Sequence, residues 1–167
     1  MVIRTRTAAA PSGLRRLLLR APIHLYRWRL GWLLGSRFLL LTHIGRTSGA
    51  HRRVVLEVTG RDPLSGGYLV ASGFGPSSQW YRNIAHTPEV TVQIGRHAFT
   101  ATAHPLNPTG SGLALARYAE QHPRAARSLM RFCGLHVDGT QRDYFLAGRD
   151  HIPFATLVPS DADRPRG

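Results

Sequence analysis

Residues 37–59 read Arg-Phe-Leu-Leu-Leu-Thr-His-Ile-Gly-Arg-Thr-Ser-Gly-Ala-His-Arg-Arg-Val-Val-Leu-Glu-Val-Thr, and they carry the clearest signal of the fold class. The short apolar run over 37–44 is typical of a buried strand. A tight polar loop follows over 45–49, with a glycine at each end. The β-branched run over 52–59 predicts a second strand. Two strands joined by a short glycine-bearing loop predict a β-hairpin.

The pattern continues with short elements on the C-terminal side of this hairpin. It predicts strands over 68–71, 90–94, 97–105 and 152–158, and helices over 79–85, 109–121, 123–132 and 143–147. No alternation of strand, helix and strand occurs, so a parallel Rossmann sheet is not expected. About six strands with a few helices predict an α+β fold, mainly antiparallel β, in which a small barrel closes its own edges.

A chain of 167 residues can bury a genuine core, and we expect one domain over 13–159. Residues 1–12 are predicted to be a disordered lead-in, and 160–167 a loose polar tail. An amphipathic helix is predicted over 13–35, with arginines between its leucines and a kink at Pro22. The arginines exclude a membrane span. This helix either lies on an anionic bilayer through Trp28 and Trp32 or packs on the barrel.

The charge of the chain predicts an anionic partner. The net charge is +13, and all 22 basic residues are arginine, a usage common in proteins from GC-rich genomes. Such a surface suits a nucleic acid, an anionic membrane or a polyanionic ligand. The chain lacks a helix-turn-helix signature and the aromatics of an RNA-recognition motif, so nucleic acid is not expected. The single Cys133 and nine scattered histidines predict no metal site.

The loop of the hairpin has the chemistry of an anion site. Glycines permit sharp turns that expose amide groups, and hydroxyls and guanidinium groups are ligands of phosphate and carboxylate. These donors come from Arg46, Thr47, Ser48, Arg52 and Arg53. An ordinary solvated hairpin loop is the alternative.

Two later stretches could hold a flat ring. Small residues end the strand at 70–73, where Ser72 could hydrogen-bond a ring carbonyl; an ordinary glycine turn is the alternative. In the helix over 79–85, Asn83 offers both a donor and an acceptor. Trp80 and Tyr81 are expected to anchor the core.

Taken in order, these motifs resemble a known family. Gly-Arg-x-Ser-Gly at 45–49, Ala-Ser-Gly-x-Gly at 71–75 and Trp-Tyr-x-Asn-x-x-x-x-Pro-x-Val-x-Val-Gln-x-Gly at 80–95 look like the deazaflavin-dependent nitroreductase and quinone reductase family. The resemblance implies a split β-barrel that binds F420, a cofactor with a phosphate and an oligoglutamate tail. It also implies that the acceptor side is closed by a tyrosine, for which Tyr144 is the nearest match.

The cofactor-binding residues that the resemblance implies fall into two groups. Those beside the phosphate and tail are Arg46, Thr47, Ser48, Arg52, Arg53, Val54, Val55, Leu56 and Glu57. Those beside the deazaflavin are Val70, Ala71, Ser72, Gly73, Gln79, Trp80, Tyr81, Arg82 and Asn83. Thr47 departs from the lysine common in the family. Some barrels of this type bind a flavin or haem, so FMN and FAD stay as alternatives to F420.

The resemblance implies an F420H2-dependent oxidoreductase that transfers a hydride to a quinone, a nitroaromatic or an activated double bond. Ser72 or Tyr144 would donate a hydrogen bond or a proton to the acceptor oxygen. The alternative is a binding protein for F420, a flavin or a tetrapyrrole without turnover. We expect a cytoplasmic location, free or peripheral on the inner face of the plasma membrane. Split barrels of this type are often dimeric, so the sequence is compatible with a homodimer.

Overall fold

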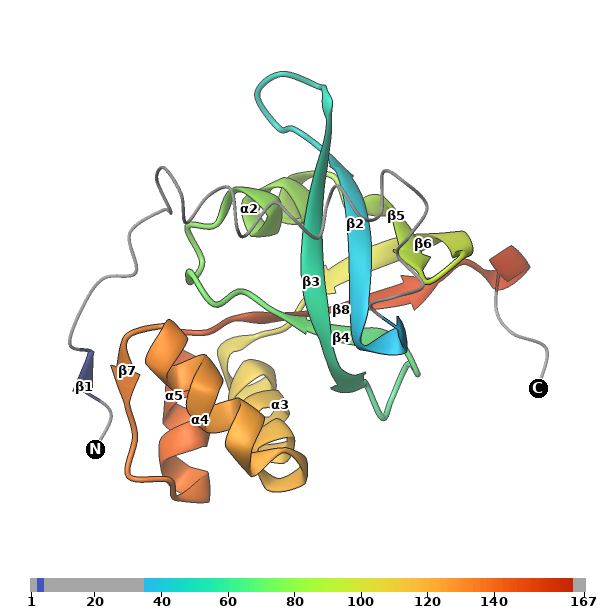
Figure 1. The fold of residues 1–167 in the computed structure, drawn as a ribbon. Helices are drawn as coiled ribbons and strands as arrows, with labels where there is room; N and C mark the ends of the chain where they lie inside the picture. The colour runs from blue at the N-terminus through green and yellow to red at the C-terminus, as the bar shows by residue number, and fades with distance from the viewer. Residues whose placement is uncertain (1–2, 5–34, 164–167) are drawn as a thin grey trace. The chain divides into compact units, whose positions relative to one another are not determined.

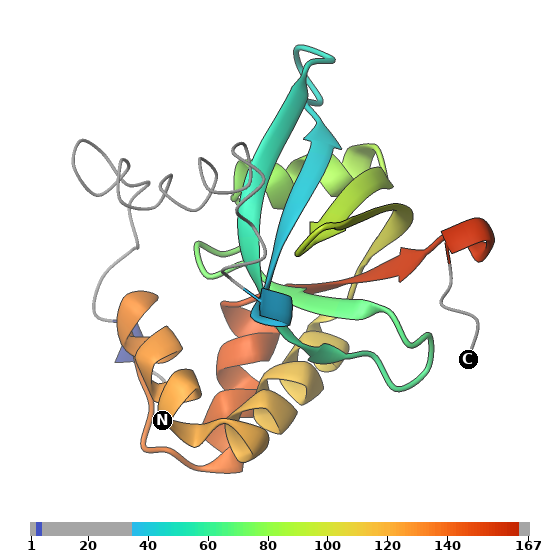
Figure 2. The same cartoon turned by 45° about the vertical axis from the view of Figure 1, so that its right-hand side comes forward.

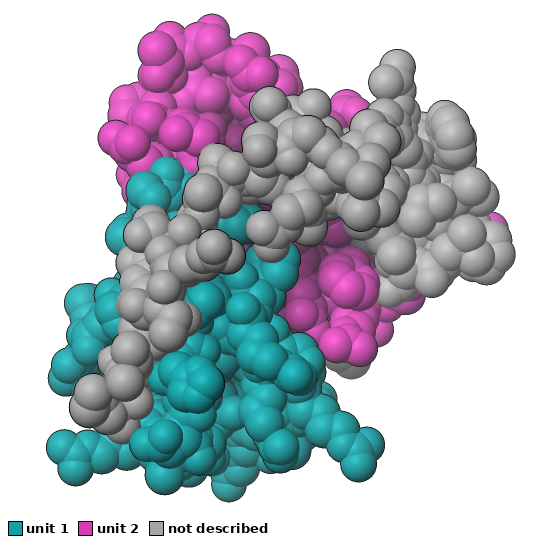
Figure 3. Space-filling view, turned by 60° about the vertical axis from the view of Figure 1, so that its left-hand side comes forward, with its two compact units in different colours: residues 1–10, 71–78, 105–155 teal, residues 11–70, 79–104, 156–167 magenta. Residues whose placement is uncertain are grey.

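The computed structural model describes residues 3–4 and 35–163. Contacts divide the chain into two compact units, shown in Figure 3. We call residues 11–70, 79–104 and 156–167 the barrel unit, and residues 1–10, 71–78 and 105–155 the helical unit. The single domain expected over 13–159 stays a prediction.

Six strands form a closed barrel in the order β2-β3-β4-β8-β6-β5, as Figure 1 shows. They are β2 (Phe38–Ile44), β3 (His51–Arg61), β4 (Tyr68–Ala71), β5 (Glu89–Ile94), β6 (His97–Pro105) and β8 (Phe154–Pro159). The pairs β2–β3, β3–β4, β2–β5 and β5–β6 are antiparallel. The prediction of a mainly antiparallel α+β fold with a barrel of about six strands is confirmed.

The hairpin of β2 and β3 runs in unbroken register from Phe38 opposite Glu57 to Ile44 opposite His51. The two strands lie side by side in Figures 1 and 2. Side chains alternate between the faces of a strand. On β2, Leu39 and Leu41 are fully buried, and His43 follows on the same face with only 4% of its surface exposed. The hairpin therefore carries one polar ring into the buried side of the barrel unit.

Helix α2 (Gln79–His86) packs beside β2. Its buried residues are Trp80, Asn83 and Ile84, which share one face because they are three and four positions apart. Asn83 therefore points inward with two apolar neighbours.

The helical unit contains α3 (Pro108–Gln121), α4 (Pro123–Phe132) and α5 (Gln141–Asp150), with α3 packed against both others. Asn107 and Thr140 cap α3 and α5 by accepting from backbone amides of the first turn. Helices α3 and α5 approach closely at glycines. A Cβ on Gly148 would lie 2.5 Å from the Ser111 carbonyl oxygen, so no larger residue fits without displacing the backbone. Leu115, Met130 and Ile152 belong to the core of this unit.

Most elements occur where the sequence predicts them, and strands β4 and β6 and helix α4 have the predicted bounds. The structure adds β1 (Ile3–Arg4), which pairs antiparallel with β7 (Leu135–His136). These two described residues of the predicted lead-in are thus in a strand. The start of the predicted tail forms η2 (Asp161–Asp163).

The predicted helix over 13–35 lies outside the described residues, apart from Gly35. Within residues 3–4 and 35–163, no helix has the length and apolarity needed to cross a bilayer.

Candidate functional site

The loop between β2 and β3 is a tight turn closed by its own backbone. The Gly45 amide donates to the Ala50 carbonyl at 2.8 Å, and the Gly49 amide donates to the Gly45 carbonyl at 2.7 Å. Gly49 has a positive φ of 66°, which glycine adopts without strain. Thr47 and Ser48 are exposed, and Ser48 Oγ accepts from the Ala50 amide at 3.3 Å, which leaves its proton for a ligand. The turn thus presents two hydroxyl groups next to Arg46.

Arg46 is held by α2 at both its backbone and its guanidinium. Its amide donates to Asn83 Oδ1 at 3.1 Å, and its Nη1 donates to Asn83 Oδ1 at 3.2 Å and to Gln79 Oε1 at 2.8 Å. These bonds join the loop to a helix that lies more than thirty residues further along the chain. The structure therefore brings together Arg46, Gln79 and Asn83, three of the predicted site residues.

Asn83 also contacts His43 on β2. Its Nδ2 lies 3.1 Å from His43 Nδ1, and both residues are 4% exposed. Burial lowers the pKa of His43, a hydrogen bond with the backbone of Ile44 opposes this shift, and the charge of Arg52 adds to it. His43 is absent from the site residues named by the sequence motifs. Only the alternation of side chains along β2 could have indicated it, because this alternation places His43 on the same buried face as Leu39 and Leu41.

Strand β3 supplies two further cations beside the loop. Arg52 and Arg53 are exposed, and neither forms an ion pair with any residue in the described part of the chain. Further along β3, Val54 and Val55 are half-buried and Leu56 is buried. The side chains of these three residues are apolar and offer no hydrogen bond to a ligand.

Glu57, also predicted to contact the cofactor, is held in an ion pair. Its Oε1 lies 3.0 Å from Arg37 Nη2. This carboxylate is therefore neutralised at the end of the hairpin remote from the loop.

The residues next to Asn83 on α2 serve packing more than polar contact. Trp80 is buried and meets the Tyr81 ring edge to face, with centroids 5.6 Å apart. Burial raises the pKa of Tyr81. Arg82 is exposed. Trp80 and Tyr81 thus anchor the helix, as the sequence predicts for residues of this type.

The stretch Val70–Gly73 divides between the two units. Val70 is fully buried in the barrel unit, whereas Ala71, Ser72 and Gly73 belong to the helical unit. Ser72 Oγ lies 2.7 Å from the Gly75 carbonyl oxygen and 2.7 Å from Ser78 Oγ. A hydroxyl has one proton, so Ser72 donates to the carbonyl and accepts from Ser78. This geometry uses the Ser72 hydroxyl to close a turn.

Gly73 allows the 71–78 segment to approach α4. A Cβ at this position would lie 3.2 Å from the Sγ of Cys133, which is buried. The predicted small residue thus fits a tight contact inside the helical unit, and a larger one would require Cys133 to shift.

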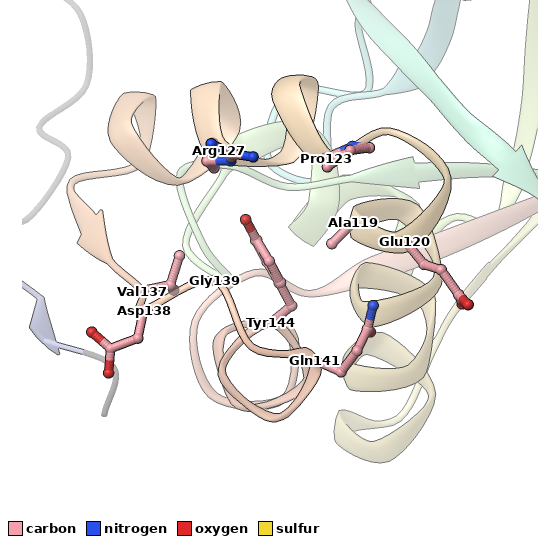
Figure 4. Close-up of a pocket in the computed structure, with 9 residues that line it drawn as sticks. All are labelled: Ala119, Glu120, Pro123, Arg127, Val137, Asp138, Gly139, Gln141 and Tyr144. Carbon is pink, nitrogen blue, oxygen red and sulfur yellow. The ribbon is translucent and has the colours of Figure 1, made fainter.

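Tyr144 lines a pocket of about 590 Å³ in the helical unit. Figure 4 shows its ring reaching from α5 into this space, with the hydroxyl toward α4. The residue as a whole is 4% exposed, but its hydroxyl oxygen is open to the pocket, and no hydrogen bond joins this oxygen to a described residue. The pocket lining comprises Ala119, Glu120, Pro123, Arg127, Val137, Asp138, Gly139, Gln141 and Tyr144. Ser72 is not part of it, so the two predicted catalytic residues do not share this pocket.

Comparison with known proteins identifies the family. Residues 21–128 match the family model described as F420H(2)-dependent quinone reductase. The chain belongs to this family. It is an oxidoreductase by that membership, and the resemblance seen in the sequence motifs is confirmed. The match includes the loop, β3, α2 and the 70–73 stretch, but it ends before Tyr144.

Solved structures with a similar fold are distant in sequence. The protein Atu2129 from Agrobacterium tumefaciens str. C58, of unknown function, is 18% identical with a TM-score of 0.53, over 90% of this chain and 59% of that chain. The conserved hypothetical protein Rv2991 from Mycobacterium tuberculosis is 14% identical with a TM-score of 0.52, over 77% and 76%. These two likenesses show the fold alone.

A structure of an F420-H2 dependent reductase (FDR-A) is 22% identical, with a TM-score of 0.49, over 73% of this chain and 95% of that chain. No curated protein matches the chain.

Proposed function

We propose that the protein binds F420 through the arginine-bearing loop of the barrel unit and, with F420H2, reduces a quinone or a related oxidised acceptor. One observation carries this proposal. Arg46, Arg52 and Arg53 gather at the loop, and no carboxylate within residues 3–4 and 35–163 pairs with any of them. Cations left without acidic partners suit a ligand that is itself a polyanion.

The donor chemistry of the loop fits the phosphate and oligoglutamate tail of F420. Guanidinium groups bind such oxygens through planar, bidentate bonds. Both protons of Arg46 Nη1 are engaged by Gln79 and Asn83, which leaves three of the five guanidinium donors for a ligand. Thr47 and Ser48 add exposed hydroxyls. Thr47 replaces the lysine common in the family, and Arg52 and Arg53 would supply the missing charge.

The deazaflavin ring, when bound, supplies a hydride to the acceptor, and one proton completes a quinol from a quinone. The protein needs no nucleophile for this reaction. It must hold the ring, bring the acceptor within about 3.5 Å and donate to the developing oxygen anion. We assign that donor role to the Tyr144 hydroxyl, because it lacks a described partner and opens into a pocket from a residue that is otherwise buried. Ser72 is the weaker candidate, since its proton is used by the Gly75 carbonyl.

Fluorescence titration of the purified protein with F420, and with FMN and FAD in parallel, tests the proposal. We expect selective F420 binding that is lost in the Arg46→Ala/Arg52→Ala variant. Arg124→Ala, which removes an exposed arginine of α4, is the matched control and should bind as the wild type does. Preference for a flavin would overturn the cofactor assignment. Selective binding without reduction of menadione by F420H2 would favour the carrier function over the reductase.

The proposal extends to a peripheral position on an anionic membrane, where lipid-soluble quinones are found. It is supported by the arginines and tryptophans of the sequence over 13–35. Sedimentation with vesicles of phosphatidylglycerol and phosphatidylcholine, using the full chain and a variant lacking residues 1–35, tests it. We expect only the full chain to sediment. Equal recovery of both forms in the supernatant would exclude the membrane position.

A further inference from the structure

The His43 ring, the Asn83 amide and Arg46 form a chain of hydrogen bonds that is buried at His43 and partly buried at Arg46, and chemistry determines the directions of these bonds. Asn83 Oδ1 accepts two hydrogen bonds from Arg46. An amide oxygen only accepts, so this end of the side chain must face Arg46 and the Nδ2 donor must face His43. His43 Nδ1, which lies 3.1 Å away, must then accept. The ring proton is therefore on Nε2.

The charged groups around His43 and its burial favour this neutral form, and the hydrogen bond with the Ile44 backbone opposes them without reversing the lowered pKa. Arg52 faces it from β3 as its partner in the strand register. Arg46 is on the far side of the Asn83 amide, and α2 contributes only that uncharged amide toward the ring. Strand β5 pairs with this end of β2 through Thr91. Glu89 lines a groove with Thr42 and Ile44, which point to the other face of β2. The named charges near the ring are thus positive.

We propose that His43 is a positioning residue for the loop: as a neutral acceptor it fixes the Asn83 amide, which in turn fixes the backbone and guanidinium of Arg46. This inference rests on the proposed function, because the loop is the part that would bind the phosphate and tail of F420. The ligand itself touches Arg46 and not His43. Without the acceptor at Nδ1, the Asn83 amide can rotate, and Arg46 loses two of its three described hydrogen bonds.

Protonation of Nδ1 would break the chain, because a second donor would then face Asn83 Nδ2. The pKa of His43 is lowered, so the unfolded chain binds this proton first as the pH falls. The contribution of His43 is complete above the ordinary value of 6.5 and is lost as the pH falls through the lower folded-state pKa. F420 affinity should follow the same direction, falling on the acid side.

Nitrogen-15 NMR of histidine-labelled protein tests the tautomer without any cofactor. We expect His43 to show a protonated Nε2 and a bare Nδ1 at pH 7.5. Hydrogen exchange of the Arg46 amide provides the second readout, because this amide donates to Asn83 Oδ1. Exchange should become faster in His43→Leu and stay slow in His43→Asn, whose side-chain oxygen replaces Nδ1 as the acceptor. A proton on Nδ1, or equal exchange in all three proteins, would overturn the proposal.

F420 titrations from pH 5.0 to 7.5 connect the chain to ligand binding. We expect His43→Leu to bind about tenfold more weakly than the wild type at pH 7.5, the usual cost of one lost buried hydrogen bond. His43→Asn should retain affinity and lack the acid-side loss that the wild type shows. His104→Asn, a change at an exposed histidine of β6, is the control and should keep the wild-type pH profile.

The outcomes of these experiments distinguish the positioning role of His43 from the proposed F420-dependent function. If the wild type binds F420 and His43→Leu binds equally well, the positioning role fails and the proposed function stands. If the wild type does not bind F420, the proposed function fails, and the ring tautomer and Arg46 exchange still decide the role of His43.

Discussion

Asn83 in the barrel unit and Tyr144 in the helical unit are equally buried, each with 4% of its surface exposed, but their polar atoms are in opposite situations. Asn83 is bonded at both ends, to Arg46 and to His43. The Tyr144 hydroxyl has no hydrogen-bond partner in the described part of the chain and faces a pocket. A buried group with all its bonds made holds a structure in place, whereas a hydroxyl that opens into a pocket with a bond to spare is available to a ligand.

The largest expected effect comes from removing the bonded side chain. Asn83→Leu would leave the Arg46 amide and the His43 ring without their partner, which should reduce the free energy of unfolding by about 3 kcal/mol. F420 binding should weaken by about a hundredfold, because Arg46 would no longer be fixed. Urea unfolding and fluorescence titration measure the two effects. Wild-type affinity in this variant would show that the chain does not organise the loop.

Removing the unbonded Tyr144 hydroxyl should have the opposite pattern of effects, with stability kept and turnover reduced. Tyr144→Phe breaks no described hydrogen bond, so its unfolding free energy should stay within about 0.5 kcal/mol of the wild type. Turnover of menadione should fall about tenfold if the hydroxyl donates to the acceptor oxygen, with F420 affinity unchanged. Steady-state kinetics at saturating F420H2 measure this. Unchanged turnover would remove Tyr144 from the reaction.

Ser72 tests whether a hydroxyl that already has hydrogen-bond partners serves stability or the reaction. Ser72→Ala removes its bonds to Gly75 and Ser78 inside the helical unit, and we expect a loss of about 1 kcal/mol in stability. Turnover corrected for folded protein should be unchanged. A fall in corrected turnover as large as that of Tyr144→Phe would instead assign Ser72 to the reaction.

The smallest effect is expected at the exposed cations. Arg53→Ala should weaken F420 binding only about threefold at low salt, because an exposed ion pair contributes little. The difference from the wild type should shrink as sodium chloride rises to 0.5 M, since screening reduces attraction between exposed charges. Arg124→Ala again provides the control. A difference that persists at high salt would point to a direct, desolvated contact.

The sequence predicts the local elements well, because period and turn chemistry act over a few residues. The hairpin of β2 and β3 and the start of α4 at Pro123 are examples. The pairing of β1 with β7 could not be predicted, since two-residue strands leave no periodic signal and their partners are far apart in the chain. The family motifs identified Arg46, Gln79 and Asn83 as site residues, and the structure shows them bonded together.

The role of His43 was beyond the sequence for a different reason. A histidine on the buried face of a strand is usually satisfied locally, and only the fold brings α2 against β2 so that Asn83 reaches the ring. The same holds for Tyr144, whose pocket is formed by three helices and a loop. Sequence motifs identify donors, but the fold determines which donors already have partners.

Because Gly73 lies close to the buried Cys133, the reactivity of this thiol can report the rate at which the helical unit opens. The chain has a single cysteine, and its sulfur is buried beneath a backbone segment that carries no side chain at that point. A disulfide reagent can reach this sulfur only when the structure around Cys133 opens, and the 71–78 segment is one part of that cover. The rate of labelling at saturating reagent therefore counts openings of the helical unit, one thiol per molecule, with no probe to be introduced.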